Sequence, residues 1–189
     1  IDLSTLDGTN GFTLRGVASS TGFSDSTVSN AGDVNGDGFD DIIVAANAAG
    51  PNGLTNAGQS FVVFGKAGGF DAEIDLSSLS SGDSSVGFAL NGVESGDFSG
   101  RVSNAGDFNG DGFDDVLISA ISADANGVAN AGETYLVFGK ASGFAASFNL
   151  SDLDGNNGFV INGINVADLS GRISNAGDIN GDGFDDILI

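Results

Sequence analysis

The chain has 189 residues, enough for one sizeable domain, and carries 26 Asp and Glu against 5 Lys and Arg, a formal net charge of −21. Nucleic acids and anionic membrane surfaces attract basic patches, so we expect neither as a partner. No apolar run approaches the roughly 18 residues of a membrane helix, which argues against membrane insertion.

Cysteine, histidine and methionine are all absent. Without cysteine and histidine the chain lacks thiolate chemistry and the usual general base, so we expect no enzymatic activity. Without methionine, and with Ile1 as its first residue, the chain has the pattern of a processed product or a piece of a longer protein.

Three related copies divide the chain. Residues 1–6 (IDLSTL) match 74–79 (IDLSSL) and 148–153 (FNLSDL), at spacings of 73 (74 − 1) and 74 (148 − 74) residues. Self-similarity at a nearly fixed period is the sequence signature of a repeat architecture. The copies run 1–73, 74–147 and 148–189, and the last one is truncated.

Each copy reads as several short strands. In the first copy, residues 12–16 alternate apolar and mostly polar side chains, as a half-exposed strand does. Residues 27–32 are small, as in a crowded inner strand, while 42–46 and 60–65 are apolar and read as buried strands. Counterparts lie at 88–92, 101–106, 116–120 and 134–139 in the second copy and at 159–163, 172–177 and 187–189 in the third.

Four short strands per copy with dense glycine turns favour an all-β fold made of β-propeller blades, each a four-stranded antiparallel sheet. The ring is expected to be incomplete in one chain. A solenoid or an ordinary sandwich is the alternative. The period exceeds the roughly 40–50 residues usual for propellers, which implies an inserted connection. We place the Leu-Ser-x-Leu segment in it, as a short helical turn or a bulged loop.

An acidic nonapeptide separates the second and third predicted strands of every copy. It spans 33–41 (DVNGDGFDD), 107–115 (DFNGDGFDD) and 178–186 (DINGDGFDD). Positions 1, 3, 5 and 9 carry side-chain oxygens, and Ca²⁺ is a hard cation that takes about six to eight oxygen ligands. Glycines such as Gly38 allow the sharp turn that a loop around such an ion needs. One copy could equally be a polar turn without metal, whereas three copies with the same oxygens favour about three Ca²⁺ sites.

We expect each loop to contribute four side chains and the backbone carbonyl of position 7. The predicted ligands are Asp33, Asn35, Asp37, Phe39 and Asp41 in the first loop, Asp107, Asn109, Asp111, Phe113 and Asp115 in the second, and Asp178, Asn180, Asp182, Phe184 and Asp186 in the third.

These loops do not read as EF-hands. An EF-hand needs a bidentate Glu at position 12 and flanking helices, whereas position 12 is apolar in every copy and a strand pattern follows. The remaining acid, at position 8, is expected to bond backbone N–H groups and not the metal. It is Asp40, Asp114 or Asp185 in the three copies.

These residues resemble the FG-GAP repeats of the integrin α-subunit N-terminal β-propeller and of related bacterial surface proteins. The resemblance spans essentially the whole chain, and its most specific part is the acidic loop. In that family positions 1, 3, 5 and 9 of the loop bind calcium through side chains and position 7 through its carbonyl. The resemblance implies a calcium-binding extracellular module, secreted or at a cell surface, that mediates adhesion or binds a protein or carbohydrate ligand.

An alternative function follows from the partial copies. Unpaired strand edges invite further strands, so the chain could be a structural assembly unit. It would complete its sheets with other copies of the chain or with further repeats of a parent protein. In either case Ca²⁺ is expected to act structurally, by fixing the loops between strands.

Overall fold

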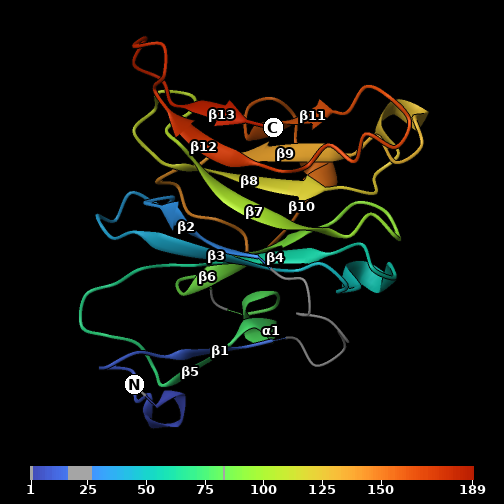
Figure 1. Cartoon of the computed structure of the whole chain (residues 1–189). Coiled ribbons are helices and arrows are strands. Elements are labelled where there is room, and N and C mark those ends of the chain that lie inside the picture. The colour runs from blue at the N-terminus through green and yellow to red at the C-terminus, as the bar shows by residue number, and fades with distance from the viewer. Residues whose placement is uncertain (1, 17–26, 83) are drawn as a thin grey trace.

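The computed structural model describes residues 2–16, 27–82 and 84–189. In Figure 1 the sheets are stacked in chain order, from the N-terminus at the bottom to the C-terminus at the top. The all-β prediction is confirmed, and most strands lie in antiparallel sheets of the kind that form propeller blades. Over the described residues the sheets do not close into a ring. No helix within those ranges is long and apolar enough to cross a membrane.

The elements are short. The strands are β1 (Thr13–Arg15), β2 (Val28–Gly32), β3 (Asp41–Ala46), β4 (Gln59–Val63), β5 (Glu73–Asp75), β6 (Gly87–Asn91), β7 (Ser99–Gly106), β8 (Asp115–Ala120), β9 (Glu133–Val137), β10 (Ser147–Asn149), β11 (Gly158–Asn162), β12 (Ser174–Gly177) and β13 (Asp186–Leu188). The helical turns are η1 (Leu3–Thr5), η2 (Pro51–Gly53), α1 (Leu76–Leu79), η3 (Ala125–Gly127) and η4 (Leu150–Asp152).

The two largest sheets share one strand plan. Strands β2, β3 and β4 run antiparallel in sequence, and β6 pairs with β4 as the fourth strand. The same order recurs as β7, β8, β9 and β11. Because β6 and β11 follow the copy boundaries at residues 74 and 148, each blade takes its fourth strand from the next sequence copy. Because each sequence copy supplies a strand to the blade before it, consecutive copies are held together.

The remaining strands belong to partial blades. Strands β12 and β13 pair antiparallel and correspond in sequence to the first two strands of a blade. Strand β1 corresponds to β6 and β11, so it occupies the place of a fourth strand. The described chain therefore consists of two complete blades between two partial ones.

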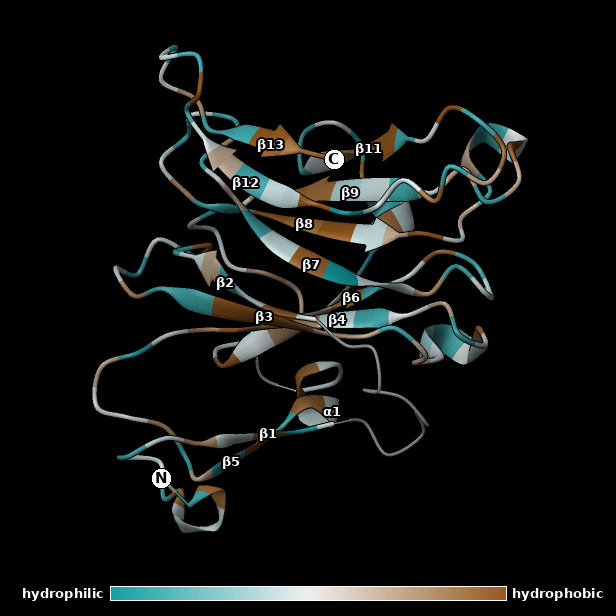
Figure 2. Cartoon of the chain, in the orientation of Figure 1, coloured by the Kyte–Doolittle hydropathy of each residue, from teal (hydrophilic) through white to brown (hydrophobic). Residues whose placement is uncertain are grey.

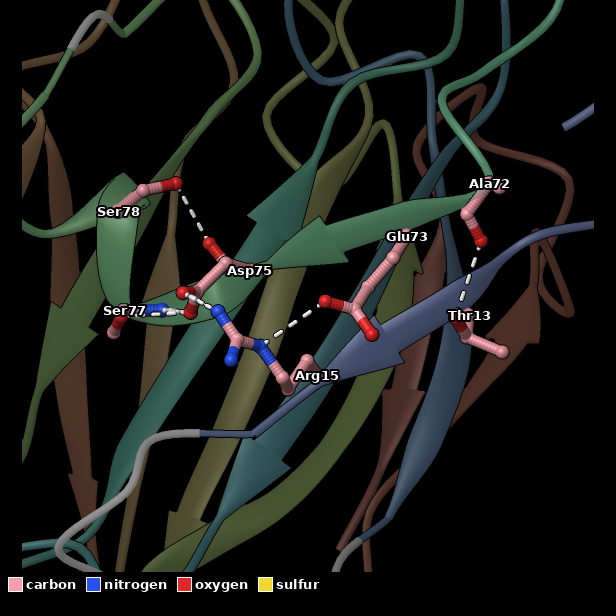
Figure 3. A network of polar contacts seen from close by, with 7 residues as sticks. All are labelled: Thr13, Arg15, Ala72, Glu73, Asp75, Ser77 and Ser78. Carbon is pink, nitrogen blue, oxygen red and sulfur yellow. Dashed lines mark hydrogen bonds and ion pairs between the residues drawn. The ribbon is translucent and has the colours of Figure 1, made fainter.

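A short parallel strand extends the outer edge of a blade. Strand β10 pairs with β6 so that Asn149 lies opposite Asn91, and β5 pairs with β1 so that Asp75 lies opposite Arg15. In Figure 3 the Arg15 guanidinium reaches Asp75 and Glu73, with 3.2 Å from Nε to Glu73 Oε1. Asn91 Nδ2 bonds Asn149 Oδ1 at the equivalent place, at 3.0 Å. A charged pair in one blade thus replaces an amide pair in the next.

The Leu-Ser-x-Leu segments form short helical turns, as predicted. In α1 the Asp75 carboxylate accepts the N–H of Ser77 at 3.0 Å, and Asp2 does the same for Ser4 before η1. A side-chain acceptor before the first turn satisfies a backbone donor that the helix itself leaves free. This cap supports the turn in the first two copies, whereas η4 begins after Asn149 without a side-chain cap bond, so the cap is not what places the turn.

The core lies between the sheets. Figure 2 shows apolar colour along β3 and β8, whose residues are almost all buried. Both faces of these strands pack on neighbouring sheets, so their apolar residues are continuous and do not alternate. Residues 88–92 were predicted to form a half-exposed strand. That prediction was wrong, because β6 is buried throughout. Strand β10 and the ring of Phe144, stacked on Phe88 with centroids 4.1 Å apart, contribute to that burial.

Gly58 marks a close approach between the connection before β4 and the first residue of β7. Its φ is +90°, and a Cβ built there would lie 1.9 Å from the carbonyl oxygen of Ser99. We expect Gly58→Ala to lose about 1–2 kcal/mol of unfolding free energy for the left-handed backbone. A further loss of about 1–3 kcal/mol is expected from the collision, because a backbone carbonyl cannot move away as a side-chain tip can.

Gly53→Ala is the matched control, since Gly53 has φ +80° and open space at the Cβ position. Urea denaturation of the two variants should separate the collision from the backbone cost. Equal losses in the two variants would contradict the close approach.

Candidate calcium loops

The three acidic loops lie at the same edge of the stack, each between the first two strands of a blade. They join β2 to β3, β7 to β8 and β12 to β13, on the left of Figure 1. The hairpin position predicted for them is confirmed. Glycine precedes each loop in left-handed conformation, with φ of +71° at Gly32, +67° at Gly106 and +63° at Gly177.

Side chains at positions 1, 3 and 5 fold back onto the loop that carries them. Asp33 Oδ1 accepts the N–H of Asp37 at 3.0 Å, and Asp33 Oδ2 accepts that of Gly38 at 2.8 Å. Asn35 Oδ1 also accepts the N–H of Asp37, and Asp37 Oδ1 accepts that of Phe39. The other two loops repeat all four bonds. The oxygen-bearing side chains therefore turn into the loop in every copy.

The Asp at position 9 ties the loop to the third strand of its blade. Asp41 accepts the N–H of Val34 at 3.0 Å and that of Gly65 at 2.8 Å, and it is buried. Asp115 is also buried and makes the equivalent bonds at 3.1 and 2.9 Å. Burial raises the pKa of Asp41 to about 6 and that of Asp115 to about 7, and the acids at positions 1 and 5 add to the rise. A nearby cation would offset the free-energy cost of ionising these buried carboxyl groups.

The third loop is less enclosed. Asp186 is half-buried and accepts the N–H of Ile179 at 3.0 Å. Asp178 accepts the N–H groups of Gly181, Asp182 and Gly183, and these bonds, that of Gly183 first, lower the pKa of its carboxyl group. The loop therefore keeps its internal bonds, while its position 9 makes a weaker connection to the blade.

Consecutive loops contact each other through positions 7 and 8. Asp114 Oδ2 accepts the N–H of Asp33 at 2.8 Å, and the N–H of Asp114 donates to the carbonyl of Asp33 at 3.2 Å. The Phe113 ring covers Gly36, where a Cβ would come within 2.3 Å of it. The third loop binds the second in the same way, through Asp185 on Asp107 and Phe184 on Gly110. We call this arrangement the loop-to-loop contact.

The expectation that position 8 bonds backbone N–H groups is therefore confirmed for Asp114 and Asp185. The bonded groups belong to the preceding copy, which the sequence could not reveal. The neighbouring acids and burial raise the pKa of Asp114, burial being the larger cause. In the first copy, Asp40 Oδ2 accepts a hydrogen bond from the side-chain amide of Asn30, at 3.4 Å from Nδ2.

In donor chemistry the loops fit a hard divalent cation. Each offers three carboxylates and one amide, with no nitrogen or sulfur ligand. The loop carboxylates are not gathered around one point in this structure. Within residues 2–16, 27–82 and 84–189, no group is arranged to hold a metal ion through three or more Asp, Glu, His or Cys side chains. Asp33 Oδ1 accepts two N–H groups, from Gly36 and Asp37, and Asp178 Oδ1 likewise accepts two, so side chains would have to rotate before such oxygens could bind an ion. The carbonyl ligands of Phe39, Phe113 and Phe184 stay predictions.

A second group of acids was not anticipated from the sequence. The buried Asp97 faces Glu94, Glu133 and Asp124, and its carboxylate accepts the N–H of Glu94 at 3.1 Å. Burial, with those three acids, raises the pKa of Asp97 to about 6. The hydroxyl of Tyr135 donates to Glu133. The repeat pattern held no signal for this group, because the first copy has Gln59 where the second has Glu133.

The raised pKa of Asp97 predicts a pH-dependent gain in Asp97→Asn. The folded chain keeps this proton to about pH 6 while the unfolded chain loses it near 3.8, so stability falls as pH rises between those values. The variant keeps an acceptor for Glu94 and removes the charge. At pH 7.5 it should be more stable by roughly 1–3 kcal/mol, with no difference near pH 4.

Urea denaturation at both pH values measures this effect. Asp168→Asn is the control, because Asp168 is the exposed counterpart in the third copy and accepts the N–H of Asn165. Its stability should change little at either pH. A loss of equal size at both pH values in Asp97→Asn would contradict the prediction.

Comparison with known proteins gives two findings. A family model described as FG-GAP repeat matches residues 26–63 and 96–137, which include the first two acidic loops and the strands β3 and β8 that follow them. Phosphatidylinositol-glycan-specific phospholipase D of Dictyostelium discoideum is 30% identical over 166 residues, covering 83% of this chain and 17% of that protein. The chain thus spans less than a fifth of that relative's length.

Proposed function

We propose, from the premise that this chain belongs to the FG-GAP repeat family, that it is a calcium-binding β-propeller module in which Ca²⁺ has a structural role. The observation that carries the proposal is the shared geometry of the acidic loops. All three copies turn the same carboxylate and amide oxygens into the loop. The residues that would hold the ion are those at positions 1, 3, 5 and 9, with the carbonyl of position 7.

The proposed role of the ion is to remove repulsion and fix the turn. Carboxylates one or two residues apart repel each other, and those of Asp41 and Asp115 are also buried. A bound Ca²⁺ would neutralise this charge and hold the loop between two strands. Since an unfolded loop offers no formed site, the free energy of binding would become free energy of folding.

We further propose that the module is secreted or lies at a cell surface, where it mediates adhesion or binds a protein or carbohydrate ligand. FG-GAP repeats typically occur in extracellular proteins. Millimolar extracellular Ca²⁺ can fill sites too weak for the cytosol. Calcium-dependent retention on immobilised glycans or matrix proteins would test the ligand role, and retention equal in chelator and in Ca²⁺ would oppose it.

We propose no catalytic activity for this chain. The phospholipase activity in the name of the relative belongs to that protein, of which the chain spans 17%. The chain has no histidine or cysteine, and most of its clustered acids lie in the loops. Hydrolysis of a phospholipid or glycan substrate by the purified chain would contradict this assignment.

The proposal predicts that the three sites differ in affinity. Calorimetric titration of the metal-free chain should detect about three ions, the third loop being weakest because Asp186 is less enclosed than Asp41 or Asp115. Position 5 can be removed from one loop at a time. The variants are Asp37→Ala, Asp111→Ala and Asp182→Ala.

Each variant should lose one ion, and the weakest binding phase should vanish in Asp182→Ala. Asp71→Ala, an exposed acid outside the loops, is the control and should keep every ion. Three sites of equal affinity would contradict the order, and unchanged stoichiometry in all variants would contradict the calcium assignment.

A further inference from the structure

The loop-to-loop contact joins ligand positions of two neighbouring candidate sites. Asp114 Oδ2 accepts the N–H of Asp33, and the N–H of Asp114 donates to the carbonyl of Asp33. Both backbone groups of Asp33 are therefore held by one residue of the next copy. Asp33 is position 1 of the first loop, whose carboxylate is a predicted ligand. Asp114 lies between positions 7 and 9 of the second loop, which are predicted ligands as well.

A second connection runs through two consecutive amides after β9. The N–H of Gly139 donates to Asp115 Oδ1 at 2.9 Å, and the N–H of Lys140 donates to the carbonyl of Val34 at 2.9 Å. Asp115 is position 9 of the second loop, and Val34 is position 2 of the first. A Cβ built at Gly139 would lie 2.4 Å from the carbonyl oxygen of Asp114 and 2.9 Å from that of Val34. One backbone segment therefore fits closely against both loops and bonds to each.

These contacts give the second loop a means of positioning the first. With calcium bound through positions 7 and 9 of the second loop, Phe113 and Asp115 would be fixed in place. Asp114 lies between them and would be fixed as well. The Phe113 ring would then stay over Gly36, and the backbone of Asp33 would keep its two bonds. A site whose groups are already placed loses less free energy to ordering when it binds its ligand.

We propose that Asp114 is a positioning residue for the first loop, and Asp185 for the second, so that calcium in one loop raises the affinity of its neighbour. The inference rests on the proposed calcium-binding function and states how the sites are coupled. The second junction repeats the first, because Asp185 bonds Asp107 and Phe184 covers Gly110. Thermodynamic linkage makes the effect reciprocal, so each loop of a pair should raise the affinity of the other by the same factor.

Electrostatic repulsion between ions in neighbouring loops acts in the opposite direction. An ion in one loop cancels part of its negative charge, so the next loop attracts a second cation less strongly. Salt screens this effect, with a Debye length of about 8 Å at 0.15 M ionic strength, whereas contacts between partly buried groups are screened much less. We therefore expect positive coupling at 0.15 M salt and a larger coupling factor at higher salt.

Calcium titration of the full chain, followed by NMR, tests the coupling loop by loop. The amides of Gly38 and Gly112, at position 6, donate to the position 1 carboxylates and report on the first and second loops separately. Asp111→Ala removes a predicted ligand from the second loop and should weaken calcium binding by the first loop about fivefold or more. Asp37→Ala should weaken binding by the second loop by the same factor.

A double-mutant cycle isolates the role of Asp114. In the Asp114→Ala background, adding Asp111→Ala should change the affinity of the first loop little further. Asp114→Asn keeps an acceptor oxygen for the N–H of Asp33 and should restore the coupling. Asp40→Ala is the matched control, because Asp40 is position 8 of the first loop and accepts its bond from Asn30 of the same hairpin. It should leave the coupling between the first two loops intact.

The possible outcomes separate this inference from the calcium assignment. A first loop that binds calcium equally well with and without a working second loop overturns the coupling and leaves the sites themselves in place. Coupling that persists in folded Asp114→Ala overturns the role of that residue. The Asp37→Ala and Asp111→Ala arms need no change at position 8, so they decide the matter even if Asp114→Ala does not fold. Amides that do not respond to calcium in any loop contradict the proposed function, and the inference falls with it.

Discussion

Excess chelator is expected to lower the melting temperature of this chain by about 15 °C or more. A ligand that binds the folded state alone adds about 2.7 kcal/mol per site when present at a hundred times its dissociation constant. Three independent sites would add about 8 kcal/mol. For a chain of this size each kcal/mol shifts the melting temperature by about 2–4 °C.

Circular dichroism melts in saturating Ca²⁺ and in chelator measure this change. The control is a variant with Asp37, Asp111 and Asp182 all replaced by alanine. Its melting temperature should lie near that of the chelated wild type and should not respond to calcium. A wild-type melt that is the same in both buffers would remove calcium from the account.

Asp115→Ala is expected to be the most damaging single substitution in a loop. The buried carboxylate accepts the N–H groups of Phe108 and Gly139, and alanine leaves both donors unsatisfied. Each unsatisfied buried donor costs about 1–3 kcal/mol, so the expected loss is about 2–6 kcal/mol. The loss should be larger in calcium, where a ligand is also removed. In chelator it is partly offset, because the carboxylate with a pKa of about 7 is costly to ionise.

The matched control for Asp115→Ala is Asp186→Ala. Asp186 holds the same loop position but is half-buried and accepts the N–H of Ile179, so about 1 kcal/mol should be lost. Asp115→Asn retains one acceptor oxygen and should fall between the two. Urea denaturation in calcium compares the three variants, and equal losses at residues 115 and 186 would contradict the role of burial.

The strands and loops could be predicted because their signals are local. Glycines, apolar runs and side-chain oxygens repeat at a nearly fixed spacing, and three copies separate a pattern from chance. The blade arrangement was confirmed by the sheets. The predicted half-exposure of residues 88–92 failed because a segment some 60 residues later in the chain buries β6: β10 pairs with its edge, and the ring of Phe144 stacks on Phe88. No local pattern carries that contact.

For the candidate site, too, the local features could be predicted from the sequence and the contacts between copies could not. The oxygen positions of each loop were visible in the sequence, while the contact of Asp114 with Asp33 depends on how two copies stack. The available signal was that position 8 is Asp in all copies. It indicated a bond to backbone N–H groups but not which residue supplies them. The acids around Asp97 gave no signal, since they belong to the second copy alone and come from separate connections and a strand.

A crystal structure of the chain grown with abundant Ca²⁺ tests the central claim most directly. The account predicts one ion in each of the three loops, held by the oxygens of positions 1, 3, 5 and 9 and by the carbonyl of position 7. Well-ordered loops holding water alone among those oxygens, with Ca²⁺ in excess, would contradict it.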